Sequence, residues 1–192
     1  AAQVLTFTAP TNIEQIVFLT GVNASGKSTI IDAMQVVLLG DTSGRHFNKA
    51  AAEKSNRTLK GYLRGELGDT LEGGFNYLRN GRFTSYIVLE FHDDVKNENF
   101  NLGIVADVYD DGSYDHRYFY LNAKMPENEF IADNVPLDYK ALNKFFQSEY
   151  PGKYKFFDSN RQYQDHLKKV LGNLKDKYFN LLKKAVSFSP IT

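Results

Sequence analysis

Residues 21–28 read Gly-Val-Asn-Ala-Ser-Gly-Lys-Ser, which matches the spacing G-x-x-x-x-G-K-[ST] at every fixed position. Glycines at both ends of such a loop let the backbone wrap closely around a phosphate, because they adopt conformations that a Cβ opposes. The N–H groups of the loop then point inward and form a nest for an anion. The positive end of the helix that follows supports this nest. The pattern predicts a phosphate-binding P-loop whose ligands are ATP and Mg²⁺.

Each side chain of the predicted loop has an expected role. Lys27 places a positive charge on the β- and γ-phosphates and is the expected catalytic residue. The hydroxyl of Ser28 is the expected Mg²⁺ ligand, and Thr29 is placed to reach the α-phosphate. No Asn-Lys-x-Asp motif for reading guanine follows, which favours ATP over GTP. The predicted nucleotide-binding residues are Gly21, Asn23, Ala24, Ser25, Gly26, Lys27, Ser28 and Thr29.

A strand and a helix are expected on either side of this loop. Residues 16–19 form a short apolar run that is typical of a strand buried on both faces. From Lys27 to Leu39 the apolar residues recur at helical spacing, and Gly40 is well placed to end that helix. Strand, loop and helix in this order predict an α/β fold of the P-loop NTPase class, within a single domain spanning residues 1–192.

The first 82 residues are expected to form the strand–helix unit and a basic loop region. Residues 41–82 are polar, and they predict loops with one short helix near 58–63. Residues 83–125 contain three strand-like runs, and Asp111-Gly112 between the last two is a strong hairpin-turn dipeptide. We therefore expect an antiparallel β-meander in the middle of the chain.

Residues 126–192 are expected to be helical. One helix is predicted at 136–149. A second opens at 158–160, where Asp, Ser and Asn favour helix capping, and continues to Val186 with Gly172 as a weak point.

Composition narrows the function classes. The chain has 192 residues, no Cys, and 23 basic against 23 acidic side chains. Without cysteine there is no disulfide framework and no thiol nucleophile. A dedicated nucleic-acid-binding domain usually has a basic excess, so any DNA contact is expected from a local patch. No apolar run of membrane-spanning length and no signal peptide are present, so we expect a cytoplasmic protein without a membrane partner.

The sequence shows no complete machinery for hydrolysis. A P-loop enzyme also needs an acidic residue at the end of a second buried strand. Glu90 and Asp107 are the nearest acidic strand residues, and period-2 alternation favours both as solvent-facing positions of the meander. Leu71-Glu72-Gly73-Gly74 lacks the serine of an ABC-type signature.

Beyond the P-loop, the sequence resembles a known family. Residues 23–33 are similar to the N-terminal head segment of SMC-like chromosome ATPases. Further stretches narrow the resemblance to the MukB-like branch, which includes the JetC-type ATPases of Wadjet plasmid-defence systems. These stretches are residues 35–41, 47–50, 57–66, 77–82 and 178–186.

The resemblance implies the N-terminal lobe of an ABC/SMC-type head, with C-terminal helices leading toward a coiled coil. In this family the signature and Walker B motifs lie near the other end of the same protein. Two heads sandwich ATP, and hydrolysis drives DNA loop capture or extrusion in chromosome segregation or plasmid defence. The implied partners are the C-terminal head segment, a second head in a homodimer, DNA, and kleisin-type and accessory subunits. The full-length protein is then an ATPase, and this chain alone is expected to bind ATP and hardly hydrolyse it.

Three basic residues match the family only by motif: Arg57, Lys60 and Arg64. They are candidates for contacts with the nucleotide or with DNA, and a solvated basic loop is an equally good interpretation. Two other functions also remain open. One is a self-contained P-loop kinase or phosphotransferase, and the other is a nucleotide-gated interaction module with little turnover.

Overall fold

The computed structural model describes residues 27–44, 58–69 and 75–186. Its central feature is a four-stranded antiparallel sheet in the order β3-β4-β5-β8. The strands are β3 (Phe83–Asp93), β4 (Glu98–Val108), β5 (Tyr114–Leu121) and β8 (Tyr154–Phe156). The strands β3 and β4 pair along their whole length, from Phe83 opposite Val108 to Asp93 opposite Glu98. This confirms the expected antiparallel meander.

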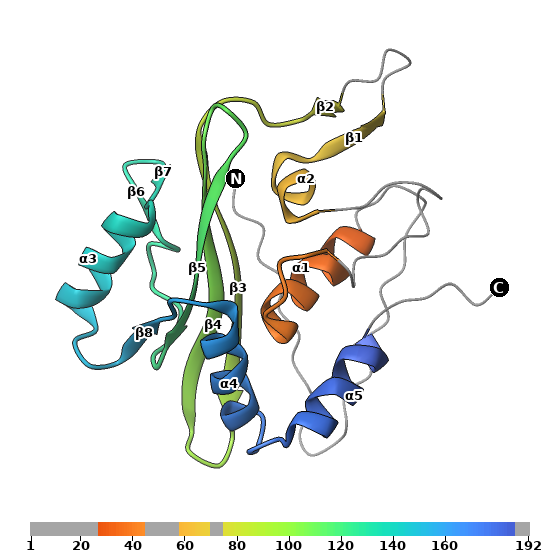
Figure 1. Ribbon diagram of the computed structural model, residues 1–192. Helices are drawn as coiled ribbons and strands as arrows, with labels where there is room; N and C mark the ends of the chain where they lie inside the picture. Colours follow the sequence, from red (N-terminus) through yellow and green to blue (C-terminus); the bar gives the residue numbers. More distant parts are fainter. Residues whose placement is uncertain (1–26, 45–57, 70–74, 187–192) are drawn as a thin grey trace.

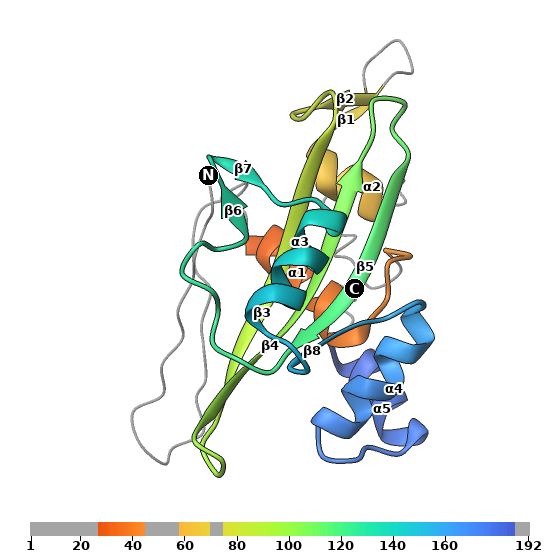
Figure 2. The same ribbon diagram turned by 90° about the vertical axis from the view of Figure 1, so that its left-hand side faces the viewer.

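Helices cover both faces of the sheet (Figure 1). On one face lie α1 (Lys27–Leu39), α2 (Leu59–Arg64), α4 (Asn160–Val170) and α5 (Asp176–Val186). On the other face lies α3 (Tyr139–Glu149), close to the short hairpin of β6 (Ile131–Ala132) and β7 (Val135–Pro136) (Figure 2). A second short hairpin, β1 (Glu66–Asp69) with β2 (Phe75–Tyr77), follows α2.

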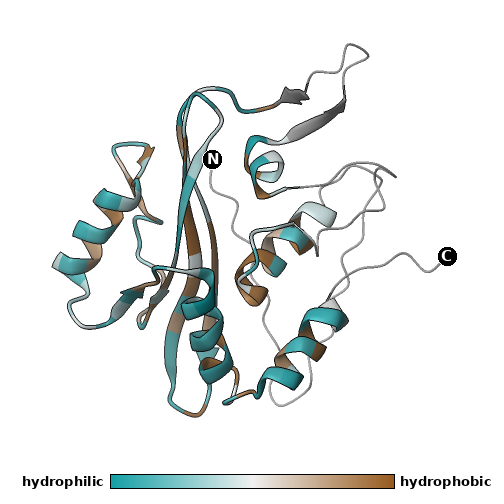
Figure 3. Cartoon of the chain, in the orientation of Figure 1, coloured by the Kyte–Doolittle hydropathy of each residue, from teal (hydrophilic) through white to brown (hydrophobic). Residues whose placement is uncertain are grey.

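Two apolar clusters hold these layers together, one on each face of the sheet. The larger cluster joins α1, α2, α4 and α5 to the strands, and its centre is the stacked pair Tyr118 and Tyr163, whose ring centroids are 4.1 Å apart. The smaller cluster packs Phe130 and Phe146 against Phe119. Apolar residues are accordingly concentrated in the sheet and at the end of α1 beside it (Figure 3). Burial of these large side chains is the main stabilising contribution to the fold.

Two turns show why the sequence folds this way locally. In the turn between β4 and β5, Gly112 has φ +82°, and the carboxylate of Asp111 accepts from the backbone N–H of Ser113 at 2.8 Å. This confirms the predicted hairpin turn. At the end of α1, Gly40 has φ +59°, a left-handed conformation that glycine adopts without strain.

The region after residue 125 differs from the expected all-helical organisation. The predicted helix at 136–149 begins only at Tyr139, because Pro136 lies in β7 and Asp138 caps the helix. The predicted long C-terminal helix is two helices, because Gly172 (φ +94°) and Asn173 (φ +56°) reverse the chain between them. The strand β8 also lies in this region and extends the sheet beside β5.

The loop region before the meander also contains more structure than expected. The short helix is confirmed as α2, which begins after the capping residue Thr58 and ends at Gly65. The hairpin of β1 and β2 was not predicted. Within the described ranges, no helix combines the length and the apolar character that crossing a membrane requires.

Candidate nucleotide-binding site

Of the predicted phosphate-binding residues, the structure describes the last three, residues 27–29, which lie at the start of α1. Gly21, Asn23, Ala24, Ser25 and Gly26 lie outside the described residues. The helix begins at Lys27, whose side chain is likewise not described.

In the first turn of α1, Ser28 is half-buried and Thr29 is exposed. The first N–H groups of a helix have no acceptor within it, and they point out of this end. The first turn contains no acidic residue. Its positive partial charge is therefore not offset by a carboxylate of its own, which suits an anionic ligand.

A buried polar stripe runs along α1 from this turn. Asp32 is fully buried and Gln35 is 4% exposed. They follow Ser28 at i+4 and i+7, so the three residues share one side of the helix. Both residues have interaction partners within the protein. Neither Asp32 nor Gln35 was predicted as a site residue, although each is a polar residue that interrupts the apolar helical pattern.

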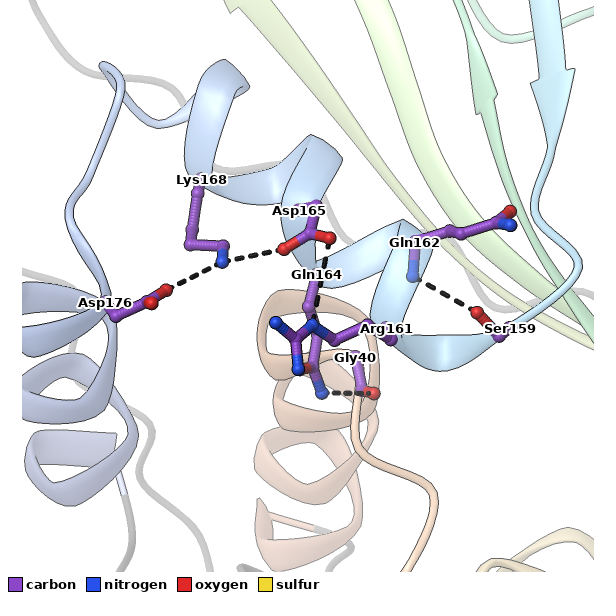
Figure 4. Close-up of polar contacts among 8 residues, drawn as sticks. All are labelled: Gly40, Ser159, Arg161, Gln162, Gln164, Asp165, Lys168 and Asp176. Atoms are coloured by element: carbon purple, nitrogen blue, oxygen red, sulfur yellow. Dashed lines mark hydrogen bonds and ion pairs between the residues drawn. The ribbon is translucent and has the colours of Figure 1, made fainter.

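The other end of α1 is held by three side chains. The hydroxyls of Tyr118 and Tyr163 donate to the carbonyls of Val36 and Val37 at 2.8 and 2.7 Å. The side-chain amide of Gln164 donates to the carbonyl of Gly40 at 3.1 Å (Figure 4). The donors to Val37 and Gly40 satisfy carbonyls that the end of a helix leaves without partners. Burial raises the pKa of both tyrosines well above the usual value, so their hydroxyls remain protonated donors.

The helix α2 contacts the phosphate end of α1. The hydroxyl of Tyr62 donates to the backbone carbonyl of Thr29 at 3.1 Å. Of the three basic candidates, Arg57 lies outside the described residues. Lys60 is half-exposed and lies beside Gly112 in the β4–β5 turn.

Arg64 is only 4% exposed, in contrast to what a direct contact with DNA requires. Its guanidinium donates to the carbonyls of Arg79 and Tyr109 at 3.1 and 2.6 Å. These bonds make Arg64 a structural residue of the junction between α2 and the sheet. Arg64 is therefore not among the contacts that we propose for nucleotide or DNA.

The two acidic strand residues both accept hydrogen bonds from groups in or next to the sheet. Asp107 is half-buried, and its carboxylate accepts from the hydroxyl of Thr84 at 2.7 Å and the backbone N–H of Tyr139 at 3.2 Å. Glu90 is exposed as expected, and it accepts from the side chain of Asn99 and the N–H of Met125. Within the described ranges, no group of three or more carboxylate or imidazole side chains is arranged to hold a metal ion.

A shallow pocket of ≈ 370 Å³ lies elsewhere, between the first half of β5 and the start of α4. In the lining of this pocket, Nε2 of His116 lies 3.0 Å from the side-chain oxygen of Asn160. The side-chain amide of Asn160 donates to the hydroxyl of Thr42 at 3.1 Å. Thr42 follows the C-terminal end of α1. The pocket therefore adjoins the end of α1 opposite to the phosphate-binding turn, and it is not part of the candidate nucleotide site.

Comparison with known families supports the P-loop. Residues 5–54 match the family described as the P-loop containing region of AAA domain. The match covers residues 21–28 and the whole of α1. The chain therefore contains a P-loop NTPase region, and this class of region generally binds a nucleotide with Mg²⁺. A comparison with curated proteins gives no match.

Proposed function

We propose that this chain is the ATP-binding half of an SMC-like ATPase head, of the MukB-like branch that includes the JetC-type ATPases. The observation that carries the proposal is the P-loop sequence at the start of α1, which the family match also covers. The antiparallel sheet packed on α1 agrees with an N-terminal head lobe. The sequence resemblance supports the finer assignment.

The residues of this chain suit the binding of a triphosphate. The positive end of α1 and the charge of Lys27 attract the phosphates. Ser28 lies in the same turn, and its hydroxyl is the hard oxygen ligand that Mg²⁺ prefers. When bound, Mg²⁺ offsets negative charge on the β- and γ-phosphate oxygens.

The remaining half of the site is proposed to come from other polypeptide segments. Glu90 and Asp107 are both hydrogen-bonded within the sheet region, which supports a separate source for the Walker B acid. We assign that role to the C-terminal head segment of the same protein. A second head completes the ATP sandwich as a homodimer, with DNA and with kleisin-type and accessory subunits, in the cytoplasm. ATP then joins the heads and hydrolysis releases them during DNA loop capture or extrusion.

The test is Mg²⁺-ATP binding and steady-state hydrolysis, measured for this chain alone and mixed with its C-terminal head segment. We expect the chain alone to bind ATP with almost no turnover, and the mixture to hydrolyse it. Lys27→Ala removes the charge that faces the phosphates. It is expected to weaken binding about 10- to 100-fold, the range for losing a hydrogen bond to a charged group.

The same measurement separates the alternatives. Turnover by the chain alone, lost in Lys27→Ala, would contradict the half-head and favour a compact P-loop phosphotransferase. Tight binding without turnover in the mixture would favour a nucleotide-gated interaction module. Binding that is unchanged in Lys27→Ala would contradict the P-loop assignment itself.

A further inference from the structure

The helix α2 makes a contact with α1 that the proposed function does not use. The hydroxyl of Tyr62 donates to the carbonyl of Thr29, one residue beyond the expected Mg²⁺ ligand Ser28. The same peptide group carries the N–H of Ile30, the fourth residue of α1. It directly follows the N–H groups of the first turn, which have no acceptor within the helix. The bond therefore joins α2 to the turn of α1 that faces the phosphates.

The helix α2 is itself defined at both ends. Thr58 caps its start, accepting from the N–H of Gly61 at 3.1 Å. Gly65 ends it with φ +66°. Leu59 and Leu63 point into the larger apolar cluster, with 0% and 3% of their surfaces exposed. A helix of this length is not stable alone, so these caps and buried contacts fix its position.

A reciprocal pair of arginines ties α2 to the chain that follows it. Arg64 donates to the carbonyl of Arg79 at 3.1 Å, and Arg79 donates to the carbonyl of Leu63 at 2.9 Å. Arg64 also donates to the carbonyl of Tyr109, at the end of β4. Through these bonds α2 is attached to the sheet by one side and to α1 by Tyr62.

We propose that Tyr62 is a positioning residue for the nucleotide. Its hydroxyl holds the first turn of α1 where the phosphates are received, and α2 is the rigid support from which it does so. This inference rests on the proposed nucleotide binding. It gives α2 and its capping residue Thr58 a bracing role beside the nucleotide.

The physical reason is preorganisation of the free protein. Phosphate binding requires N–H groups already aimed at one point, and any molecule with a displaced turn does not bind. The apparent dissociation constant equals the intrinsic one divided by the fraction of molecules whose turn is in the binding arrangement. Loss of the Tyr62 bond therefore weakens binding by displacing the turn in the free protein. If the turn stayed in place without the bond, only the stability of the protein would change, and the affinity would not.

The test compares two tyrosines that bond the same helix at opposite ends. Tyr62→Phe removes the donor at the phosphate end, and Tyr163→Phe removes the donor to Val37 at the far end. The dissociation constants of N-methylanthraniloyl-ATP and -ADP with Mg²⁺ are measured by fluorescence, and Tm by circular dichroism.

We expect Tyr62→Phe to weaken both nucleotides by roughly three- to tenfold, the range of one net hydrogen bond, with little change in Tm. Tyr163→Phe is expected to lower Tm and leave both dissociation constants unchanged. If Tyr163→Phe does not fold, Tyr118→Phe replaces it, because that hydroxyl bonds Val36 of the same helix.

Equal effects of the two variants on affinity would overturn the assignment and indicate a general loosening of α1. No effect of Tyr62→Phe on affinity would overturn it as well. Failure of the wild-type chain to bind either nucleotide would instead reject the proposed function, and this inference with it.

Discussion

At the scale of single residues, His166 is half-buried between two aromatic rings. Its imidazole lies 4.7 Å from the ring of Tyr120 and 5.2 Å from that of Phe157, measured between centroids. Its Nε2 atom is buried and has no hydrogen-bond partner among the described residues. Desolvation, together with the charges of Lys155 and Lys169, lowers the pKa of His166 below its usual value of 6.5.

This pKa shift predicts a pH-dependent stability. The folded state disfavours the protonated imidazole, so the unfolded state binds more protons below about pH 6.5. The native protein is therefore expected to lose stability as the pH falls from 7 to 5. His166→Phe should reduce that loss when Tm is measured across this range by circular dichroism. His92→Phe, at an exposed position, is the control, and an equal effect of both variants would contradict the assignment.

At the scale of elements, Lys168 links α4 to α5. Its ammonium lies 2.7 Å from the carboxylate of Asp165 on its own helix and 2.8 Å from that of Asp176 on α5 (Figure 4). The hydrogen bond from Lys168 lowers the pKa of each carboxyl below its usual value of 3.8. Those two hydrogen bonds also raise the pKa of Lys168 itself above 10.5. The link is therefore fully charged between about pH 4 and 10.

We predict that Lys168→Met loosens α5 from α4. Amide hydrogen exchange in α5 should become faster at pH 7, because the bridging cation is gone. The carboxylate contribution to stability is lost as the pH falls through their folded pKa values, so the difference between variant and wild type should shrink below about pH 4. Lys169→Met, which removes a neighbouring exposed lysine, should leave the exchange unchanged. Identical exchange in Lys168→Met and wild type would show that apolar packing alone holds α5.

The elements differ in how well the sequence predicts them. The bounds of α1 are predicted because helical periodicity, Gly40 and the P-loop motif all agree. The meander is predicted because alternation and the Asp111-Gly112 turn are local signals. The strand β8 is missed because it has three residues, and it is a strand only through its pairing with Phe119, Tyr120 and Leu121.

In the candidate site, too, the sequence predicts local features and misses long-range contacts. The residue types at positions 21–28 predict phosphate binding by themselves, since the motif is local. The bond from Tyr62 to Thr29 spans 33 positions, and no pattern in the sequence indicates it. Arg64 illustrates the opposite case: the family motif made it a candidate contact, whereas its guanidinium is buried among backbone carbonyls.

At the scale of the whole molecule, charge is unevenly distributed. Residues 160–186, which form α4 and α5, carry seven Lys and Arg against two Asp. The formal net charge of the chain is zero, so the rest carries the compensating excess of five acidic groups. Both aspartates are bridged by Lys168, while Lys169, Lys175 and Lys177 are exposed. We propose these exposed lysines as the local basic patch for the proposed DNA partner.

Reversing three of these charges therefore tests the DNA contact. The triple change Lys169→Glu, Lys175→Glu and Lys177→Glu is expected to weaken binding of the chain to duplex DNA. Each lost phosphate contact should also reduce the slope of log K against log salt by about 0.9. Fluorescence anisotropy of a labelled duplex, titrated at several salt concentrations, measures both quantities.

The matched control makes the same charge change on the other side of the sheet. Lys140, Lys144 and Lys153 are exposed on or next to α3, so replacing all three by Glu gives an identical net charge. If binding depended only on net charge, both triple variants would weaken it equally, and the α4–α5 surface would have no special role. If the contact is local, the control should retain the wild-type salt slope, because counterion release depends on the residues that touch the phosphates.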